Sequence, residues 1–266
     1  MDVKLHKDFH PDKSSALWGF TRSSILPCTA HSSPTIQDKS PLSTLVFIYG
    51  KFFLEDKEIF MLSTAILSYI LVALAVLIGA YLFGSFPTGY VVVKTLAHQD
   101  IREIGSGSTG ATNVKRVLGF KWFVIVLLTD AIKGIIPVVA ATYIDYSLVN
   151  GILPVLAAVG VIIGHSKPIF LKFHGGKSVA TGVGTILALN WMVGIAIALI
   201  WVTITYFSRY VSVGSIIAVW VSPFLMYALD MPMAYVAYCA LGALYITILH
   251  KDNIKRLIKH EENKVR

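Results

Sequence analysis

The chain has 266 residues, of which 55% are hydrophobic and only 14% are charged, and its formal net charge is +8. Because soluble domains carry about 25% charged residues, this composition argues against a soluble enzyme and indicates a protein that lies in lipid. The cysteines argue against a disulfide framework, since Cys28 lies in a polar segment and Cys239 in an apolar one.

The first predicted part is a polar N-terminal extension, residues 1–60. It contains the Ser-Pro-rich run SSPTIQDKSPLS and lacks the basic segment followed by an apolar segment that a signal peptide requires. From Met61 the chain is almost continuously hydrophobic, and MLSTAILSYILVALAV could itself be a translation start. We therefore expect residues 1–60 to be disordered or dispensable, and residues 61–266 to form a membrane domain.

Seven apolar runs follow, and each is a candidate transmembrane helix. A crossing helix needs roughly 17–25 residues, and one run, VATGVGTILALNWM, is shorter. We count it as a span because six crossings would scatter the basic residues over both faces of the membrane. The sequence thus predicts an all-α polytopic membrane protein with spans at 62–84, 119–142, 149–164, 179–192, 192–208, 212–229 and 232–249.

Charge predicts the orientation of these spans. With seven spans, every Lys and Arg after residue 60 except Lys133 falls on one side, whereas the opposite loops hold Asp145 and Asp230 and no basic residue. Cytoplasmic loops are enriched in Lys and Arg, so we expect a cytoplasmic C-terminus and active-site loops on that face. The same rule explains the positive net charge without nucleic acid.

The polar residues collect in four segments on the basic side: DIREIGSGSTGATNVKR, GHSKPIFLKFHGGKSVATG, SRYVSVGS and HKDNIKRL. A Gly-rich loop exposes backbone N–H groups that can close around a phosphate. A dinucleotide fold is not expected, because its fingerprint needs a preceding strand and Asp130, 20 residues after Gly110, lies inside a hydrophobic span. HGGKS also fails as the end of a P-loop, since Leu171 occupies the position of the first glycine.

Six stretches resemble, in order and spacing, the PlsY family of acyl-phosphate:glycerol-3-phosphate acyltransferases. They are YLFGSFPTGYVVVK, DIREIGSGSTGATNVKR, DAIKG, GHSKPIFLKFHGGKSVATGVG, RYVSVGSI and HKDNIKRL. The resemblance implies a seven-helix enzyme of the bacterial inner membrane that needs no metal or cofactor. It implies transfer of a fatty acyl group from acyl phosphate to the 1-hydroxyl of glycerol 3-phosphate, giving lysophosphatidic acid and phosphate, the first step of bacterial phospholipid synthesis. Association with the enzyme that forms acyl phosphate is a further expectation.

The resemblance assigns glycerol 3-phosphate binding and catalysis to Ser106, Arg116, Lys177, His250 and Asn253. Arg and Lys suit phosphate, whereas His250 and Asn253 share a helix face and can orient the glycerol hydroxyls. His250 is the available side-chain base, and the phosphate of the substrate is the alternative. The Gly-rich loop is expected to cradle acyl phosphate, and the expected substrate-binding residues are Gly105, Gly107, Gly110, Thr112, Asn113, Lys133, Arg209, Ser212 and Ser215.

Several assignments have structural alternatives. Ser106 can bond its own loop, and His250 can simply face lipid head groups at a helix end. Arg116 and Lys177 can be ordinary charges that flank a span. Lys133 lies inside a span with Asp130 three residues before it, so the pair either supports the site from beneath or is a structural ion pair. His165 and His174 are expected to be structural or interfacial, and Lys259 and Lys264 to lie in a solvated tail.

Three positions depart from the family pattern: Ser108 for Asn, His174 for Lys and Ser178 for Gly. Serine tolerates left-handed backbone less well than asparagine, so the Gly-rich loop is expected to differ in shape. The change at position 174 removes one fixed positive charge near the phosphates, and activity is therefore expected to be sensitive to pH.

Two other classes of protein compete with the enzyme. A transporter would show internal repeats and broken helices that meet at the bilayer midplane, whereas these polar motifs collect at one face. A non-catalytic assembly subunit would not need four separate loops rich in Gly, Ser, His and Lys. The sequence therefore favours the acyltransferase.

Overall fold

The computed structural model describes residues 41–145 and 151–264. Packing divides the chain into two units, Met1–Glu58 and Ile59–Arg266. In the first unit, the described residues belong to the beginning of α1 (Pro41–Gly84). Most of the predicted N-terminal extension lies outside the described residues, and its dispensability stays a prediction.

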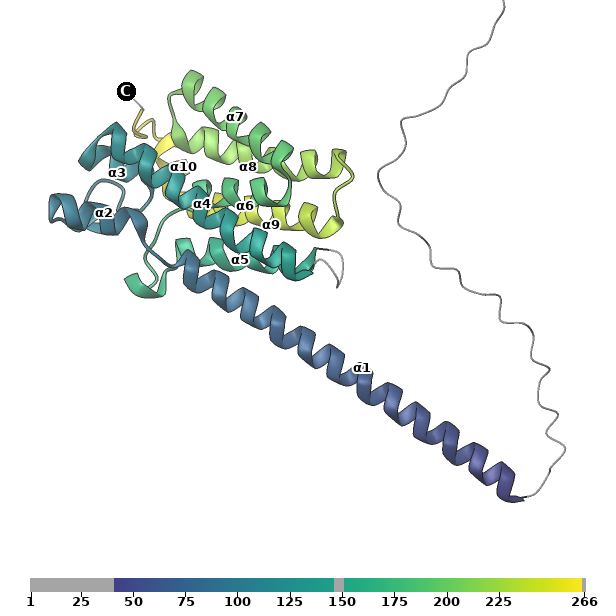
Figure 1. The fold of residues 1–266 in the computed structure, drawn as a ribbon. Helices are drawn as coiled ribbons and strands as arrows, with labels where there is room; N and C mark the ends of the chain where they lie inside the picture. The colour runs from purple at the N-terminus through teal and green to yellow at the C-terminus, as the bar shows by residue number, and fades with distance from the viewer. Residues whose placement is uncertain (1–40, 146–150, 265–266) are drawn as a thin grey trace, which may run out of the picture. The chain divides into compact units, whose positions relative to one another are not determined.

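Within the described residues, every regular element is a helix, which confirms the predicted all-α fold (Figure 1). After α1, the apolar helices are α4 (Phe120–Asp145), α5 (Ile152–Ser166), α6 (Val179–Leu189), α7 (Trp191–Ser208), α8 (Val211–Ala228) and α9 (Met233–Leu249). The polar connections carry shorter helices: α2 (Thr88–Ala97), η1 (Ile101–Glu103), α3 (Ala111–Leu118), η2 (Ile169–Leu171) and α10 (Lys251–Ile258).

Length and hydropathy support at least five crossings of a membrane by the described helices. Five stretches are long and apolar enough to cross: Asp56–Ala97, Phe120–Asp145, Ile152–Leu171, Trp191–Ser208 and Val211–Ala228. A sixth is added if α9 and α10, which meet at a bend of 60°, count as one span. Helix α6 has only 11 residues. An apolar helix occupies each of the seven predicted positions, but the count of seven crossings stays a prediction.

Helix α6 lies at the centre of the part of the fold that carries the polar loops. It packs extensively against α4 and also against α7, whereas α4 and α7 do not pack extensively against each other. Two glycines permit the close approach of α4 and α6: a side chain at Gly134 would overlap the carbonyl oxygen of Thr181, and one at Gly184 would overlap that of Ala131. The space between α4 and α7 therefore has α6 as its floor.

Candidate active site

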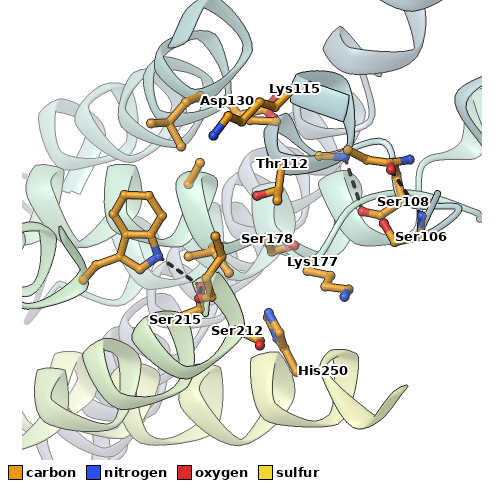
Figure 2. A pocket seen from close by; sticks show the side chains of 18 of the residues that line it. Ser106, Ser108, Thr112, Lys115, Asp130, Lys177, Ser178, Ser212, Ser215 and His250 are labelled. Carbon is orange, nitrogen blue, oxygen red and sulfur yellow. Dashed lines mark hydrogen bonds between the residues drawn. The ribbon is translucent and has the colours of Figure 1, made fainter. Parts of the chain in front are cut away.

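A cavity of about 970 Å³ joins the polar loops to the space between α4 and α7 (Figure 2). Most of the predicted site residues line it, although they come from distant parts of the sequence. They are Gly105, Ser106, Gly110, Thr112, Asn113, Arg116, Lys177, Ser212, Ser215, His250 and Asn253.

The Gly-rich loop owes its shape to the side chain of Asn113. The Nδ2 group donates to the carbonyl oxygens of Ile101, Ile104 and Ser108 at 3.2, 2.8 and 3.0 Å. The Oδ1 atom accepts from the backbone N–H of Ser106 at 3.2 Å. Asn113 is only 1% exposed, so its amide folds the loop.

Backbone geometry in this loop suits an anion. Gly105 has a φ of +60° and Gly107 a φ of +68°, in the left-handed region that favours glycine. Helix α3 begins after Gly110 without a side-chain cap, so its first amides remain available to a ligand. Ser108, one of the departures from the family pattern, accepts from the N–H of Gly110 at 3.3 Å and thereby bonds its own loop.

Lys177 stands at the polar end of the cavity on the segment between η2 and α6. Its Nζ donates to Oδ1 of Asn253. Burial, followed by the nearby charge of Arg256, lowers the pKa of Lys177 to about 8. The ammonium group is therefore charged at neutral pH and is held by a neutral amide, which leaves its charge available to an anion.

Glu262, which the sequence did not single out, fixes the other side of Asn253. Its Oε1 accepts from Asn253 Nδ2 at 2.6 Å and from Ser212 Oγ at 3.1 Å. Its Oε2 accepts from Arg256 Nε at 2.7 Å. Burial opposes ionisation of Glu262, but these hydrogen bonds keep its pKa below the usual value. An acidic residue in a polar tail has no signature in the sequence that would have identified this contact.

His250 lies between α9 and α10 and is 3% exposed. Its Nδ1 lies 2.8 Å from the carbonyl oxygen of Ile246. A carbonyl oxygen can only accept, so Nδ1 carries the proton, and Nε2 of the neutral ring is left as an acceptor. Figure 2 shows the ring directed towards Lys177 and Ser212.

The predicted serines of α8 already have partners within the protein. Ser212 bonds Glu262, as described, and Ser215 Oγ donates to the carbonyl oxygen of Val211 at 2.8 Å. Ser215 also accepts from Trp201 Nε1 at 3.1 Å, a bond drawn in Figure 2. Both hydroxyls therefore position neighbouring side chains at the cavity wall.

Three predicted substrate-binding residues, Gly107, Lys133 and Arg209, do not line the cavity. Lys133 is buried, forms an ion pair of 2.9 Å with Asp130 and donates to the carbonyl oxygen of Phe86 at 3.1 Å. Asp130 itself lines the cavity together with His165, so the ion pair lies directly behind the cavity wall, and both interpretations stated for Lys133 stay predictions.

The wall opposite the polar loops is apolar and was not predicted. Helix α6 supplies its floor, and α4 and α7 supply the sides. The lining side chains are Leu127, Leu128 and Ala131 from α4, Val179, Ala180, Val183 and Leu187 from α6, and Ala198, Trp201 and Val202 from α7. We call this part of the cavity the apolar groove.

The structure also corrects expectations about individual side chains. Lys264 is exposed, as expected for a solvated tail, but it also lines the cavity, as does Lys115. His174 is exposed and outside the cavity lining, with Nδ1 2.7 Å from the carbonyl oxygen of Lys172, so it brings no charge to the cavity. Ser178 adopts a φ of +59° and donates from Oγ to the carbonyl oxygen of Ile162 at 2.9 Å. That bond holds a left-handed conformation that glycine would adopt more easily.

Comparisons with known proteins give the relatives of this chain. Residues 74–260 match the family model described as glycerol-3-phosphate acyltransferase. A protein of that name from Trichormus variabilis is 42% identical over 205 residues, covering 72% of this chain and 91% of the relative. Another, from Endomicrobium trichonymphae, is 45% identical over 197 residues, covering 74% of this chain and 97% of the relative.

Solved structures add a match in three dimensions. A crystal structure of PlsY (YgiH), an integral membrane glycerol 3-phosphate acyltransferase in its glycerol 3-phosphate form, is 34% identical with a TM-score of 0.69. The match covers 73% of this chain and 96% of that one. The lysophosphatidic acid form of PlsY matches at 32% identity with a TM-score of 0.67.

Proposed function

The chain belongs to the glycerol-3-phosphate acyltransferase family and is an integral membrane acyltransferase, and from that premise we propose that acyl phosphate is its donor. The fatty acyl group passes to the 1-hydroxyl of sn-glycerol 3-phosphate, giving lysophosphatidic acid and inorganic phosphate. The observation that carries this proposal is the single cavity that joins cationic loops to an apolar groove. The related structures, captured in a glycerol 3-phosphate form and a lysophosphatidic acid form, support the acceptor and the product.

Lys177 and Arg116 are the proposed ligands of the phosphate of glycerol 3-phosphate, with the hydroxyl of Ser106 beside them. Both cations line the same cavity, and the side chain of each is steadied by an amide oxygen, Asn253 for Lys177 and Asn113, at 3.4 Å, for Arg116. An amide oxygen orients a cation without neutralising it, so the charge remains available to the phosphate.

His250 and Asn253 are placed to handle the glycerol hydroxyls. The oxygen of the 1-hydroxyl attacks the acyl carbonyl carbon and forms the ester bond. The bond between that carbon and the phosphate oxygen breaks, and phosphate leaves with the electron pair. The hydroxyl proton passes to Nε2 of His250, with the phosphate of the substrate as the alternative acceptor, and general base catalysis of this kind contributes about 10²–10⁴-fold.

Acyl phosphate suits this cavity because its phosphate is already a good leaving group. The site then needs no covalent nucleophile, and its task is to position two anions and stabilise developing charge. The amides at the start of α3 and the Gly-rich loop are proposed to hold the donor phosphate. The apolar groove is proposed to hold the acyl chain, since its lining is apolar and Leu128 and Val202 at its sides are each 55% exposed.

The polar end of the cavity is proposed to face the cytoplasm of a bacterial cell, with the protein in the inner membrane and the C-terminus cytoplasmic. The basic residues of the loops support this orientation. A basic cytoplasmic surface also suits association with the enzyme that forms acyl phosphate. A reporter fused to the C-terminus should be active only in the cytoplasm, and an external reporter signal would contradict the orientation.

Purified protein supplied with acyl phosphate and glycerol 3-phosphate tests the reaction. Phosphate release should depend on both substrates, and lysophosphatidic acid should accumulate in equal amount. Uptake of either compound into vesicles without chemical turnover would instead support the transporter.

A further inference from the structure

The C-terminal segment, residues 259–264, turns back onto the cavity after the end of α10. The N–H of Glu261 donates to the carbonyl oxygen of Arg256 at 2.8 Å, and that of His260 donates to Leu257 at 3.1 Å. His260 has a φ of +58°. These features form a Schellman turn, which ends α10 and reverses the direction of the chain.

Glu262 then fastens this segment to the rest of the site. Its carboxylate is 6% exposed and accepts the hydrogen bonds from Ser212, Asn253 and Arg256 described above. These partners belong to α8 and α10, so the segment is held against both helices. As a result, Asn263 and Lys264 reach the lining of the cavity.

Lys264 places a positive charge at the lining of the cavity. Its Nζ lies 5.8 Å from the centre of the Tyr210 ring, at the turn between α7 and α8. Among the residues that the structure describes, it forms no ion pair. The two carboxylates in the lining are paired with other cations, Glu262 with Arg256 and Asp130 with Lys133. The ammonium group of Lys264 therefore adds positive charge to the cavity.

We propose that Lys264 binds the phosphoryl group of the acyl phosphate donor. This proposal rests on the proposed function, in which two phosphates, each of about −1.5 to −2 charge, meet in one cavity. Lys177 and Arg116 are assigned to the phosphate of the acceptor, so the second phosphate needs another of the cations in the lining, which are Lys115 on α3 and Lys264. Lys264 supplies it from the edge next to α7, which forms one side of the apolar groove.

The same charge assists departure of the phosphate. When the bond between the acyl carbon and the phosphate oxygen breaks, the electron pair remains on phosphate, and a nearby ammonium group stabilises it. The cation–π contact with Tyr210 positions Lys264 for this role without neutralising its charge.

The test compares Lys264→Ala and Lys264→Arg with Lys259→Ala, a change at the exposed end of α10 that leaves the cavity unaltered. Initial rates give separate KM values for acyl phosphate and for glycerol 3-phosphate, and competition gives the inhibition constant of inorganic phosphate. In Lys264→Ala, the KM for acyl phosphate and the inhibition constant should each rise about tenfold, while the KM for glycerol 3-phosphate changes less than about twofold. Lys264→Arg should recover most of the affinity, and Lys259→Ala should match the parent protein.

An unchanged donor KM in Lys264→Ala, or an equal rise in both KM values, would overturn the proposal. A purely structural role would lower the melting temperature and kcat without separating the two KM values, and would also overturn it. If the parent protein itself shows no turnover with acyl phosphate, the proposed function fails, which is a different outcome from an unchanged Lys264→Ala.

Discussion

The polar end of the cavity and its apolar groove are built in opposite ways. Separate loops and helix ends form the polar end, and single side chains such as Asn113 and Glu262 hold these segments together with several hydrogen bonds each. The groove is made of three helices whose side chains repeat at helical spacing. A single substitution at the polar end should therefore abolish activity. A single substitution in the groove should only change the preference among acyl chains.

The largest effect is expected at the cations assigned to the acceptor phosphate. Lys177→Ala should reduce glycerol 3-phosphate turnover by about a thousandfold, because loss of a charged contact in a partly buried site costs about 3–5 kcal/mol. Arg116 is more exposed before substrate binds, and Arg116→Ala should cost about a hundredfold. Turnover at matched expression measures both, with Lys259→Ala as the surface control. A control that loses as much activity would show that the basic residues act as diffuse charge.

A smaller loss is expected when the Gly-rich loop loses its internal support. Asn113→Ala leaves three carbonyl groups and one N–H without their partner, at about 1–3 kcal/mol for each group that stays buried. Because misplacement of a site by about 1 Å can cost 10²-fold, activity should fall about a hundredfold.

Asn190→Ala is the matched control for this loop variant. Asn190 caps α7 by accepting from the N–H of Val193 at 3.1 Å, and it does not line the cavity. Its replacement should lower the melting temperature but retain the turnover of the folded protein. Full activity of Asn113→Ala would show that the loop does not depend on this amide.

The polar end should also respond to pH. Burial and the charge of Arg256 lower the pKa of Lys177 to about 8, so the ammonium group is charged below that pH and loses its proton above it. The KM for glycerol 3-phosphate should therefore rise with pH above about 8, by up to about tenfold per unit. His174→Ala should keep the same profile, because His174 lies outside the cavity lining. A constant KM through this range would contradict the role of Lys177.

The smallest effect, confined to specificity, is expected in the groove. Ala198→Trp should reduce turnover of long-chain donors about tenfold relative to short-chain donors, because the added ring occupies space proposed for the acyl chain. Leu199→Trp is the control, since Leu199 is 61% exposed and does not line the groove. Equal losses for all chain lengths would place the acyl chain elsewhere.

The two parts of the cavity also differ in how far the sequence could predict them. Ser106, Arg116, Lys177, His250 and Asn253 belong to compact motifs, and the structure brings all of them to one cavity. The apolar helices were predicted from hydropathy, because lipid demands long apolar runs. The groove could not be predicted, since every apolar side chain of a span looks alike until the packing of α4, α6 and α7 is known.

Contacts made by the C-terminal segment were missed for a related reason. Glu262 and Lys264 lie in a polar tail where charges are usually solvated, and only the Schellman turn at His260 brings them back to the cavity. Conversely, Lys133 was expected to bind substrate while its pair with Asp130 supports the site from beneath; the pair is present, and Lys133 also donates to Phe86, but Lys133 does not line the cavity.

A comparison of acyl phosphate with acyl-CoA as donor tests the central claim most directly. The claim requires the polar loops and the apolar groove to bind two parts of the same donor molecule. Purified protein in lipid vesicles would receive glycerol 3-phosphate with either acyl phosphate or acyl-CoA of the same chain, and lysophosphatidic acid would be measured. We expect rapid formation from acyl phosphate and little or none from acyl-CoA, since the Gly-rich loop and Lys264 are proposed to bind a phosphoryl group that is bonded directly to the acyl carbon. Comparable rates from acyl-CoA would contradict the account.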